Sequence, residues 1–294
     1  MSDHTTDPAL ETFVAHRSLL FTVAYEMLGS ATDAEDVVQE TWLRWASVDQ
    51  ASVRDPRAYL LRIVTRQALN MLRTLARQRE DYVGQWLPEP LLTSPDVAED
   101  VELAESLSIA MLAVLETLAP TERAVFVLRE VFDTPYDEIA EAVGKSPAAV
   151  RQVAHRARQR VAARRPPMQV NPGVHEQTLG QLVDAIRAGD IEALMDVLAP
   201  DVVMISDGGG IAAALPRPVE GARKVASALL GVGRVRFSTT SMRVNGAPAL
   251  LLEITGEAST VVTTTMSAGR ITGIYAIRNP HKLGRIADEA PLSR

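Results

Sequence analysis

The segment from Thr134 to Arg165 constrains the fold of this chain most strongly, because it predicts two short helices joined by a tight turn. Thr134 is expected to cap the first helix and Gly144 to end it. Ser146 is expected to cap the second helix, and a proline follows each of the two caps at the first helical position. Such a pair is typical of a helix-turn-helix.

The second helix of this segment has one apolar stripe on an otherwise cationic surface. The stripe consists of Val150, Ala154, Ala157 and Val161, spaced by four, three and four residues. Seven Lys or Arg and no Asp or Glu lie between Lys145 and Arg165, although the net charge of the whole chain is −7. This contrast predicts a recognition helix that enters a DNA groove. Expected contacts to bases are Arg151, Gln152 and His155, and expected contacts to phosphates are Arg156, Arg158 and Arg160.

Length and composition limit the class of protein. With 294 residues the chain is long enough for two or three domains, and 47% hydrophobic and 23% charged residues are typical of a soluble globular protein. The absence of cysteine excludes disulfides, thiolate metal ligands and thiol catalysis. The first residues lack a basic segment followed by an apolar run, so no signal peptide is expected, and no apolar run reaches the length of a membrane span. We therefore expect a cytoplasmic protein without a metal or a cofactor.

Three domains and two linkers are predicted along the chain. Residues 1–80 and 101–166 are expected to be all-α domains, the second with the helix-turn-helix, and residues 174–294 an α+β domain. The segments 81–100 and 167–173 are rich in proline and are expected to be linkers. Expected helices are 10–28, 34–46, 56–79, 104–118, 121–132, 176–188, 191–198 and 222–230. Expected strands are 202–206, 235–244, 249–255, 259–266 and 271–277.

Local signals define several ends of these elements. Gly29 is expected to end the first helix, and Thr32 or Asp33 to cap the second. The pairs Asn245-Gly246 and Ala268-Gly269 are expected to form hairpin turns. The C-terminal domain is therefore expected to begin with helices and to continue as an antiparallel meander.

The expected third helix presents a polar seam made of residues spaced by four, four and three positions. The members of this arginine seam are Arg62, Arg66, Asn70 and Arg73. Such a seam suits the backbone of single-stranded DNA, and the loop at 47–54 before it suits a flipped base. For Trp42, Trp45 and Tyr59, packing in the core is favoured over stacking on bases.

Four acids and a glutamine gather near the start of the second expected helix. They are Asp33, Glu35, Asp36, Gln39 and Glu40. Negative charge at a helix N-terminus stabilises the helix whatever its partner, so half of this signal is local. The other half is a negative patch that suits a basic partner surface.

The stretches DAEDVVQETWLRW at 33–45 and YLLRIVTRQALNMLR at 59–73, followed by the helix-turn-helix, resemble bacterial sigma factors of the extracytoplasmic-function (ECF) group. The resemblance covers the first 165 residues in order. It implies that the acidic patch binds core RNA polymerase, that the arginine seam binds the melted −10 strand, and that the helix-turn-helix binds the −35 element of promoter DNA.

The last 120 or so residues resemble the SnoaL-like cone fold, which one subgroup of these sigma factors carries as a C-terminal extension. Three motifs mark that subgroup: WLPEP in the linker, DGGG after a strand, and NPHKL near the C-terminus. The resemblance implies that this domain contacts the sigma domains and regulates them in cis. The residues implied in this regulation are Trp86, Leu87, Pro88, Glu89, Pro90, Asp207, Gly208, Gly209, Gly210, Asn279, Pro280, Lys282 and Leu283.

Two other functions compete with that of a sigma factor. One is a helix-turn-helix regulator fused to a ligand-binding or isomerase-like enzyme domain, since relatives of the cone fold use a pocket Asp or His for proton transfer. His175, His281, Asp201 and Asp207 are the available groups, but they form no acid and base pair in the sequence, so we expect no enzyme. The other is a plain repressor. The sequence does not decide whether the C-terminal domain binds a small ligand. The DGGG motif is expected to be a turn with positive φ rather than a phosphate cradle.

Overall fold

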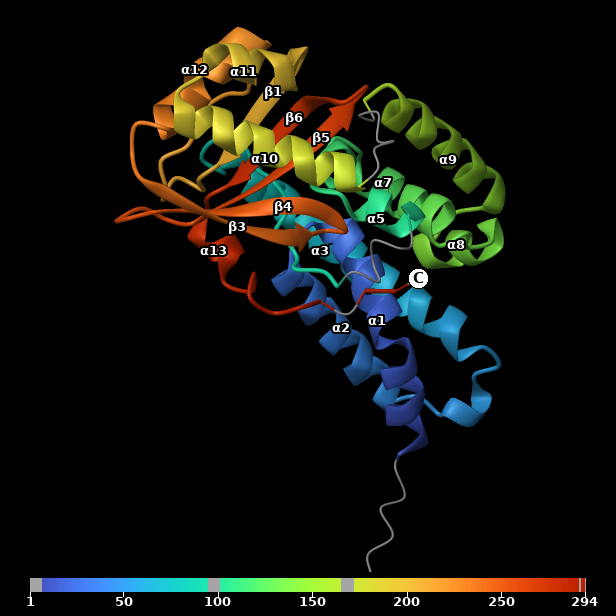
Figure 1. Cartoon of the computed structure of the whole chain (residues 1–294). Coiled ribbons are helices and arrows are strands. Elements are labelled where there is room, and N and C mark those ends of the chain that lie inside the picture. Colours follow the sequence, from blue (N-terminus) through green and yellow to red (C-terminus); the bar gives the residue numbers. More distant parts are fainter. Residues whose placement is uncertain (1–6, 95–100, 165–171, 291, 294) are drawn as a thin grey trace, which may run out of the picture. The chain divides into compact units, whose positions relative to one another are not determined.

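The computed structural model describes residues 7–94, 101–164, 172–290 and 292–293, which group into two compact units (Figure 1). The first, here called the helical unit, contains Met1–Gln78, Val114–Arg164 and Pro291–Arg294. The second, the sheet unit, contains Arg79–Ala113 and Arg165–Ala290. The segment 101–113, assigned from the sequence to the second helical domain, thus clusters with the C-terminal residues. No helix in the described ranges is long and apolar enough to cross a membrane.

The N-terminal part of the helical unit is an antiparallel pair of helices followed by a third. Its elements are α1 (Pro8–Leu28), α2 (Ala31–Ala46), the 3₁₀ turn η1 (Gln50–Ser52) and α3 (Pro56–Glu80). Gly29 ends α1 with φ 68°, as predicted. Ser30 caps α2, because its hydroxyl accepts from the backbone N–H of Asp33, so the prediction of Thr32 or Asp33 as the cap was wrong.

The helices between residues 101 and 164, which belong partly to the sheet unit and mostly to the helical unit, follow the predicted order with two local differences. Its elements are α5 (Val101–Leu107), α6 (Ile109–Leu115), α7 (Pro120–Phe126), the π-helical turn η2 (Val127–Val131), α8 (Tyr136–Val143) and α9 (Pro147–Ala162). The single helix expected over 104–118 is divided at Ser108, whose hydroxyl accepts from the N–H of Met111 at 3.2 Å. The helix expected over 121–132 ends in η2, where the backbone widens to π-helical hydrogen bonds.

The helix-turn-helix consists of α8 and α9. Gly144 ends α8 with φ 68°, and the Ser146 hydroxyl caps α9, as predicted. Thr134 does not cap α8, because Pro135 holds the N-cap position and the Thr134 side chain is buried. The predicted stripe of Val150, Ala154, Ala157 and Val161 is buried. The stripe therefore fixes which side of α9 remains available to a partner.

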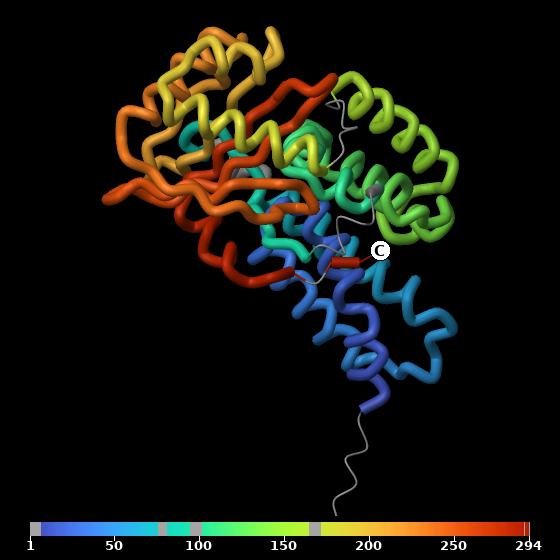
Figure 2. Tube along the Cα trace, viewed as in Figure 1, coloured from blue at the N-terminus to red at the C-terminus, as the bar shows by residue number. Residues whose placement is uncertain are grey.

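The sheet unit contains a six-stranded sheet of mixed direction in the order β2-β1-β6-β5-β4-β3. Its strands are β1 (Leu198–Asp207), β2 (Val219–Glu220), β3 (Phe237–Val244), β4 (Ala247–Ile254), β5 (Thr260–Ser267) and β6 (Arg270–Ile277). Strands β3 to β6 form the predicted antiparallel meander, whose trace folds back and forth in Figure 2. Its hairpins turn at Asn245 and Ala268, which have positive φ. Strand β1 adds to β6 in parallel, and the short β2 was not predicted.

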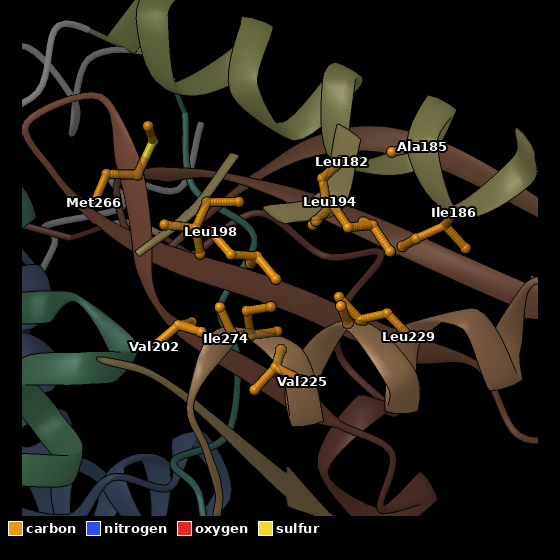
Figure 3. Packing of buried hydrophobic residues seen from close by; sticks show 13 residues of the cluster. Leu182, Ala185, Ile186, Leu194, Leu198, Val202, Val225, Leu229, Met266 and Ile274 are labelled. Carbon is orange, nitrogen blue, oxygen red and sulfur yellow. The ribbon is translucent and has the colours of Figure 1, made fainter. Parts of the chain in front are cut away.

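Helices of the sheet unit cover one face of this sheet, and α10 lies across it (Figure 1). They are α10 (Pro172–Ala188), α11 (Ile191–Val197) and α12 (Ala222–Val232), and the short α13 (Pro280–Leu283) follows β6. Leu182 and Ile186 of α10, Leu229 of α12 and Ile274 of β6 meet in one buried apolar cluster (Figure 3). This helix-on-sheet core is the α+β architecture expected from the sequence.

Candidate functional site

The described part of the predicted linker, residues 81–94, runs along the sheet unit in extended form. Leu91 accepts from the N–H of Asn245 at 2.9 Å, and Thr93 donates to the carbonyl of Arg243 at 3.1 Å. Leu87 and Leu91 are buried, and Leu87 belongs to an apolar cluster with Val244. The linker is therefore held to the sheet unit through its backbone and through its apolar side chains.

Asp207 is the centre of the hydrogen bonds that hold the linker. It lies at the end of β1 with no exposed surface, and its two carboxylate oxygens accept from four donors. Oδ1 accepts from the Tyr82 hydroxyl at 2.6 Å and from the Gly209 N–H at 3.0 Å. Oδ2 accepts from the Leu87 N–H at 2.8 Å and from Lys282 Nζ at 2.7 Å. A buried carboxylate with this many donors is fully compensated.

Lys282 of α13 balances the charge of Asp207. Its Nζ also donates to the carbonyl of Leu87 and lies 4.1 Å from the centre of the Trp86 ring and 5.0 Å from that of Tyr82. Two aromatic faces and a carboxylate therefore enclose the ammonium group, an arrangement that favours a cation. Burial and the hydrogen bond to Asp207 raise the pKa of the Tyr82 hydroxyl, so Tyr82 stays a donor.

Asn279 connects the C-terminal motif to the same place. Its Nδ2 donates to the Tyr82 hydroxyl at 2.9 Å, and its backbone N–H donates to the carbonyl of Asp207 at 3.0 Å. Its Oδ1 accepts from the N–H of His281 and caps α13. We call Tyr82, Leu87, Asp207, Asn279 and Lys282 the latch. The latch joins the linker, the DGGG motif and the NPHKL motif.

Each glycine of the DGGG motif faces a different neighbour at close range, and at Gly208 and Gly209 a side chain would not fit without a shift of that neighbour. A Cβ on Gly208 would lie 2.1 Å from the carbonyl of Ala212. One on Gly209 would lie 2.3 Å from the side-chain nitrogen of Asn279, and one on Gly210 would lie 3.1 Å from Cβ of Val83. Gly209 and Gly210 have φ of 60° and 73°, as expected for a turn with positive φ.

A second anchor of the linker, at the hairpin between β3 and β4, was not predicted from the sequence. Asn245 is fully buried, its Oδ1 accepts from the N–H of Leu91 at 2.9 Å, and its Nδ2 donates to the carbonyl of Leu107 at 2.8 Å. The Gly246 N–H donates to the Thr93 hydroxyl at 3.0 Å. The Asn245-Gly246 pair was predicted only as a turn. The amide side chain of Asn245 was the signal that this residue could also bind neighbouring backbone groups.

The other predicted regulatory residues lie around these two anchors. Pro88, Glu89 and Pro90 of the linker are buried, and Leu283 of α13 packs on the apolar cluster that contains Leu87. Pro280 is exposed at the first position of α13. The structure thus brings the three motifs together within the sheet unit.

The recognition helix α9 presents its predicted DNA contacts on the side opposite the apolar stripe. Arg151, Gln152, His155, Arg156 and Arg158 are all exposed. The Arg151 guanidinium lies 5.5 Å from the centre of the Tyr136 ring, and His155 Nε2 lies 3.0 Å from Nε2 of Gln159. Arg158 lies 3.7 Å from Glu130, and Arg160 pairs with Glu122. The cationic face is therefore available, with acids at its edge.

The arginine seam on α3 is bonded to α8 over its first half, where Arg62 is half-buried and Arg66 is exposed. Arg62 Nη1 donates to the Glu141 carboxylate at 3.0 Å, and Arg66 donates to the carbonyl of Glu141 at 2.8 Å. Asn70 and Arg73 are exposed and bond to each other at 3.1 Å. The two halves of the predicted seam thus differ, because α8 contacts the first half.

The acidic patch on α2 is present and partly paired. Asp36 and Gln39 are exposed, while Glu35 pairs with Arg17 at 2.6 Å and Glu40 accepts from Arg44 at 3.0 Å. The backbone of Asp33 is engaged by the cap of α2.

Aromatic residues of α1, α2 and α3 lie against one another. Trp45 is buried and donates to the carbonyl of Ala9 at 2.9 Å, as expected of a core residue. Its ring lies 5.9 Å from that of Tyr59, and the Trp42 ring lies 5.1 Å from that of Phe13.

An apolar cavity of about 320 Å³ lies in the sheet unit between α10, α12 and the sheet. Among the described residues that line it, Arg278 is the only ionisable one. His175 lies elsewhere, with Nε2 at 2.7 Å from the Thr264 hydroxyl, and burial lowers the pKa of its imidazole. Asp201 and His281 are exposed, and Asp207 belongs to the latch. The cavity therefore lacks the acid and base that proton-transfer chemistry needs.

Comparisons with known proteins agree with this arrangement. Residues 12–78 match the family model of sigma-70 region 2, and residues 108–161 match that of sigma-70 region 4. The ECF RNA polymerase sigma factor SigJ of Mycobacterium tuberculosis is 37% identical over 92% of this chain and 91% of its own length. A probable ECF sigma factor of that organism, SigI, is 31% identical over 98% of this chain and 99% of its own length. The crystal structure of SigJ matches with a TM-score of 0.77 at 35% identity, over 94% of this chain and 99% of that one.

Proposed function

Since the chain belongs to the ECF RNA polymerase sigma factors, we propose that it binds core RNA polymerase and directs it to promoters through the contacts predicted from the sequence. In this proposal Arg151, Gln152 and His155 of α9 contact the −35 element. The arginine seam of α3 contacts the melted −10 strand, and the acidic patch of α2 contacts the polymerase. The chain carries out no covalent chemistry.

The observation that carries this proposal is the exposed cationic face of α9, placed on a helix-turn-helix that lies within a sigma-70 region 4 match. The proposed division of the chain is a −10 and polymerase-binding domain at 1–80, a −35 domain at 101–166 and a SnoaL-like domain at 174–294. The linker at 81–100 connects the two DNA-binding domains.

We further propose that the SnoaL-like domain regulates transcription in cis by holding this linker. Support comes from the latch, since Asp207, Asn279 and Lys282 of the C-terminal part bond to Tyr82 and Leu87 of the linker. Because the linker sets the separation of the two DNA-binding domains, a held linker restricts the arrangements that these domains reach on polymerase and promoter.

Pull-down of core polymerase followed by promoter-selective transcription in vitro tests the sigma function. We expect the full chain to bind core polymerase and to start transcription at selected promoters, while it binds duplex DNA weakly alone. Tight binding to duplex DNA without association with polymerase would support the plain repressor instead.

Variants in the same assay test the regulation in cis. Asp207→Asn is expected to change the transcript yield, whereas Asp201→Asn, which alters an exposed acid of the same strand, leaves it unchanged. Removal of residues 279–294 is expected to alter transcription, and removal of residues 174–294 to reduce it. Unchanged transcription after both truncations would contradict the regulatory role while leaving the sigma function intact.

A further inference from the structure

Within the helical unit, the end of one helix in each sigma region is bonded to an arginine of the other region. The last four carbonyls of a helix have no partner inside the helix and carry partial negative charge. Arg123 of α7 lies beside the end of α1, and its Nη1 donates to the carbonyl of Met27 at 2.7 Å. Arg123 Nε also donates to the carbonyl of Leu115 at 2.9 Å, and its Nη1 pairs with Glu116 at 2.6 Å.

The reverse contact is made by the arginine seam. Arg66 of α3 donates from Nη2 to the carbonyl of Glu141 at 2.8 Å and from Nε to that of Ala142 at 3.4 Å. Both carbonyls belong to the last turn of α8. Arg62 adds an ion pair to the Glu141 carboxylate at 3.0 Å. We call these contacts of Arg62, Arg66 and Arg123 the clasp.

The oxygens that α8 presents to the seam are of the kind that a DNA strand presents. A carboxylate and two helix-terminal carbonyls are negative or partly negative acceptors, as phosphate oxygens are, and arginine suits both. A strand that follows the seam requires the same donors of Arg62 and Arg66. The loop before α3 also borders α8, because Ser52, Arg54 and Glu138 line a common cavity of about 560 Å³.

We propose that the clasp is an autoinhibitory contact, in which α8 of the −35 domain occupies the seam that binds the −10 strand and must leave before that strand binds. This inference rests on the proposed function of the seam. In this closed form α8 takes up the donors of Arg62 and Arg66, whereas Asn70 and Arg73 bond to each other. Free chain in the closed form therefore has low affinity for single-stranded promoter DNA, and opening restores it.

The two ends of the clasp differ in how readily they separate. Arg123 is 2% exposed and has several buried partners, whereas the side chains of Arg62 and Glu141 are 32% and 66% exposed. Water and salt weaken an exposed ion pair, while a buried one is costly to break. The contact of α8 with the seam is therefore the part that opens, and the contact at Arg123 is the part that persists.

A distance measurement tests the closed form without any DNA. The chain has no cysteine, so Ser52→Cys with Glu138→Cys places two spin labels on the two sides of the common cavity. We expect a short-distance population in this parent, its depletion after Glu141→Arg, and its retention after Asp137→Arg, which alters an exposed acid of the same helix. A parent without a short-distance population, or equal distances in all three proteins, would overturn the closed form.

Binding of a fluorescent single-stranded oligonucleotide of random sequence tests the inhibitory role. Glu141→Gln and Asp137→Asn change the net charge equally, but only the first removes a contact to the seam. We expect Glu141→Gln to bind the oligonucleotide about two- to fivefold more tightly than the unaltered chain, the range that an exposed ion pair provides, and Asp137→Asn to bind as the unaltered chain does. Equal effects of both variants would overturn the inhibition. A failure of Arg73→Gln to weaken binding would instead contradict the proposed role of the seam.

Discussion

The latch and the Arg62–Glu141 pair of the clasp both join segments that are far apart in the sequence, but the first is buried and the second is exposed to solvent. In the latch, the Asp207 carboxylate has no exposed surface and four donors. In the clasp, the pair of Arg62 and Glu141 is open to water. A buried charge with all its partners is costly to disturb, whereas an exposed pair is worth at most about 1 kcal/mol. The difference is consistent with the proposal that the linker stays bound while the contact of α8 with the arginine seam opens.

The largest effect is expected when the latch loses its central carboxylate. Asp207→Ala removes the carboxylate that balances the charge of Lys282 and that accepts from Tyr82 and Leu87, and it should lower the free energy of local opening of the linker by about 3–5 kcal/mol. Amide exchange of Leu87, whose N–H donates to Asp207, measures this opening. Asp201→Ala, on the same strand but exposed, should change it by less than about 0.5 kcal/mol. Similar exchange in both variants would show that the latch does not hold the linker.

Loss of the second anchor should have the next largest effect, and at a different amide. Asn245→Ala leaves the Leu91 N–H and the Leu107 carbonyl unpaired, which should cost about 2–4 kcal/mol. Asn245→Gly should cost about 1 kcal/mol less, since glycine adopts the φ of 54° without strain. Exchange at Leu91 should rise more than exchange at Leu87. Equal rises at the two amides would mean that the two anchors open as one.

Removal of a single hydroxyl tests one hydrogen bond of the latch. Tyr82→Phe keeps the ring beside Lys282 but removes the donor to Asp207, and it should cost about 1.5–3 kcal/mol, as expected for a hydrogen bond to a charged group. Exchange at Leu87 measures the loss, and Tyr136→Phe, on α8 of the helical unit, provides the control. An unchanged rate after Tyr82→Phe would show that the other three donors suffice for Asp207.

The smallest effect is expected at the clasp. A double-mutant cycle of Arg62→Gln and Glu141→Gln should give a coupling energy of about 0.2–1 kcal/mol at low salt, from the unfolding of the helical unit. The coupling should fall towards zero at 1 M salt, where the Debye length is about 3 Å. A coupling above about 2 kcal/mol that resists salt would place the clasp in the same class as the latch and would contradict an easily opened contact.

Features with a local cause were predictable from the sequence. Gly144 and Ser146 mark the turn of the helix-turn-helix, because a left-handed residue and a hydroxyl cap act over a few neighbouring residues. The hairpins at Asn245 and Ala268 follow from the same kind of signal. Two predicted helix caps were wrong because neighbouring residues compete for the cap position. Ser30 rather than Thr32 caps α2, and Pro135 rather than Thr134 holds the N-cap of α8.

Long-range partners were not predictable in this way. The seam was recognised from its spacing, but nothing in that spacing indicates that α8, which lies some 75 residues later, contacts Arg66. The meeting of the linker, DGGG and NPHKL motifs was implied only by the family resemblance. The role of Asp207 as the common acceptor needed the structure, because its donors come from three separate parts of the chain. Asn245 was missed for the same reason.

The three glycines after Asp207 each lie close to a different neighbour. Gly208 lies against Ala214, which lines the apolar cavity, while Gly209 lies against Asn279 and Gly210 against Val83 of the linker. A Cβ on Gly208 would meet both Ala212 and Ala214, so the glycine lets this part of the cavity wall approach the strand end that carries Asp207. One short loop thus packs against the cavity wall, against Asn279 and against the linker, and a side chain at any of its glycines would have to shift one of these neighbours.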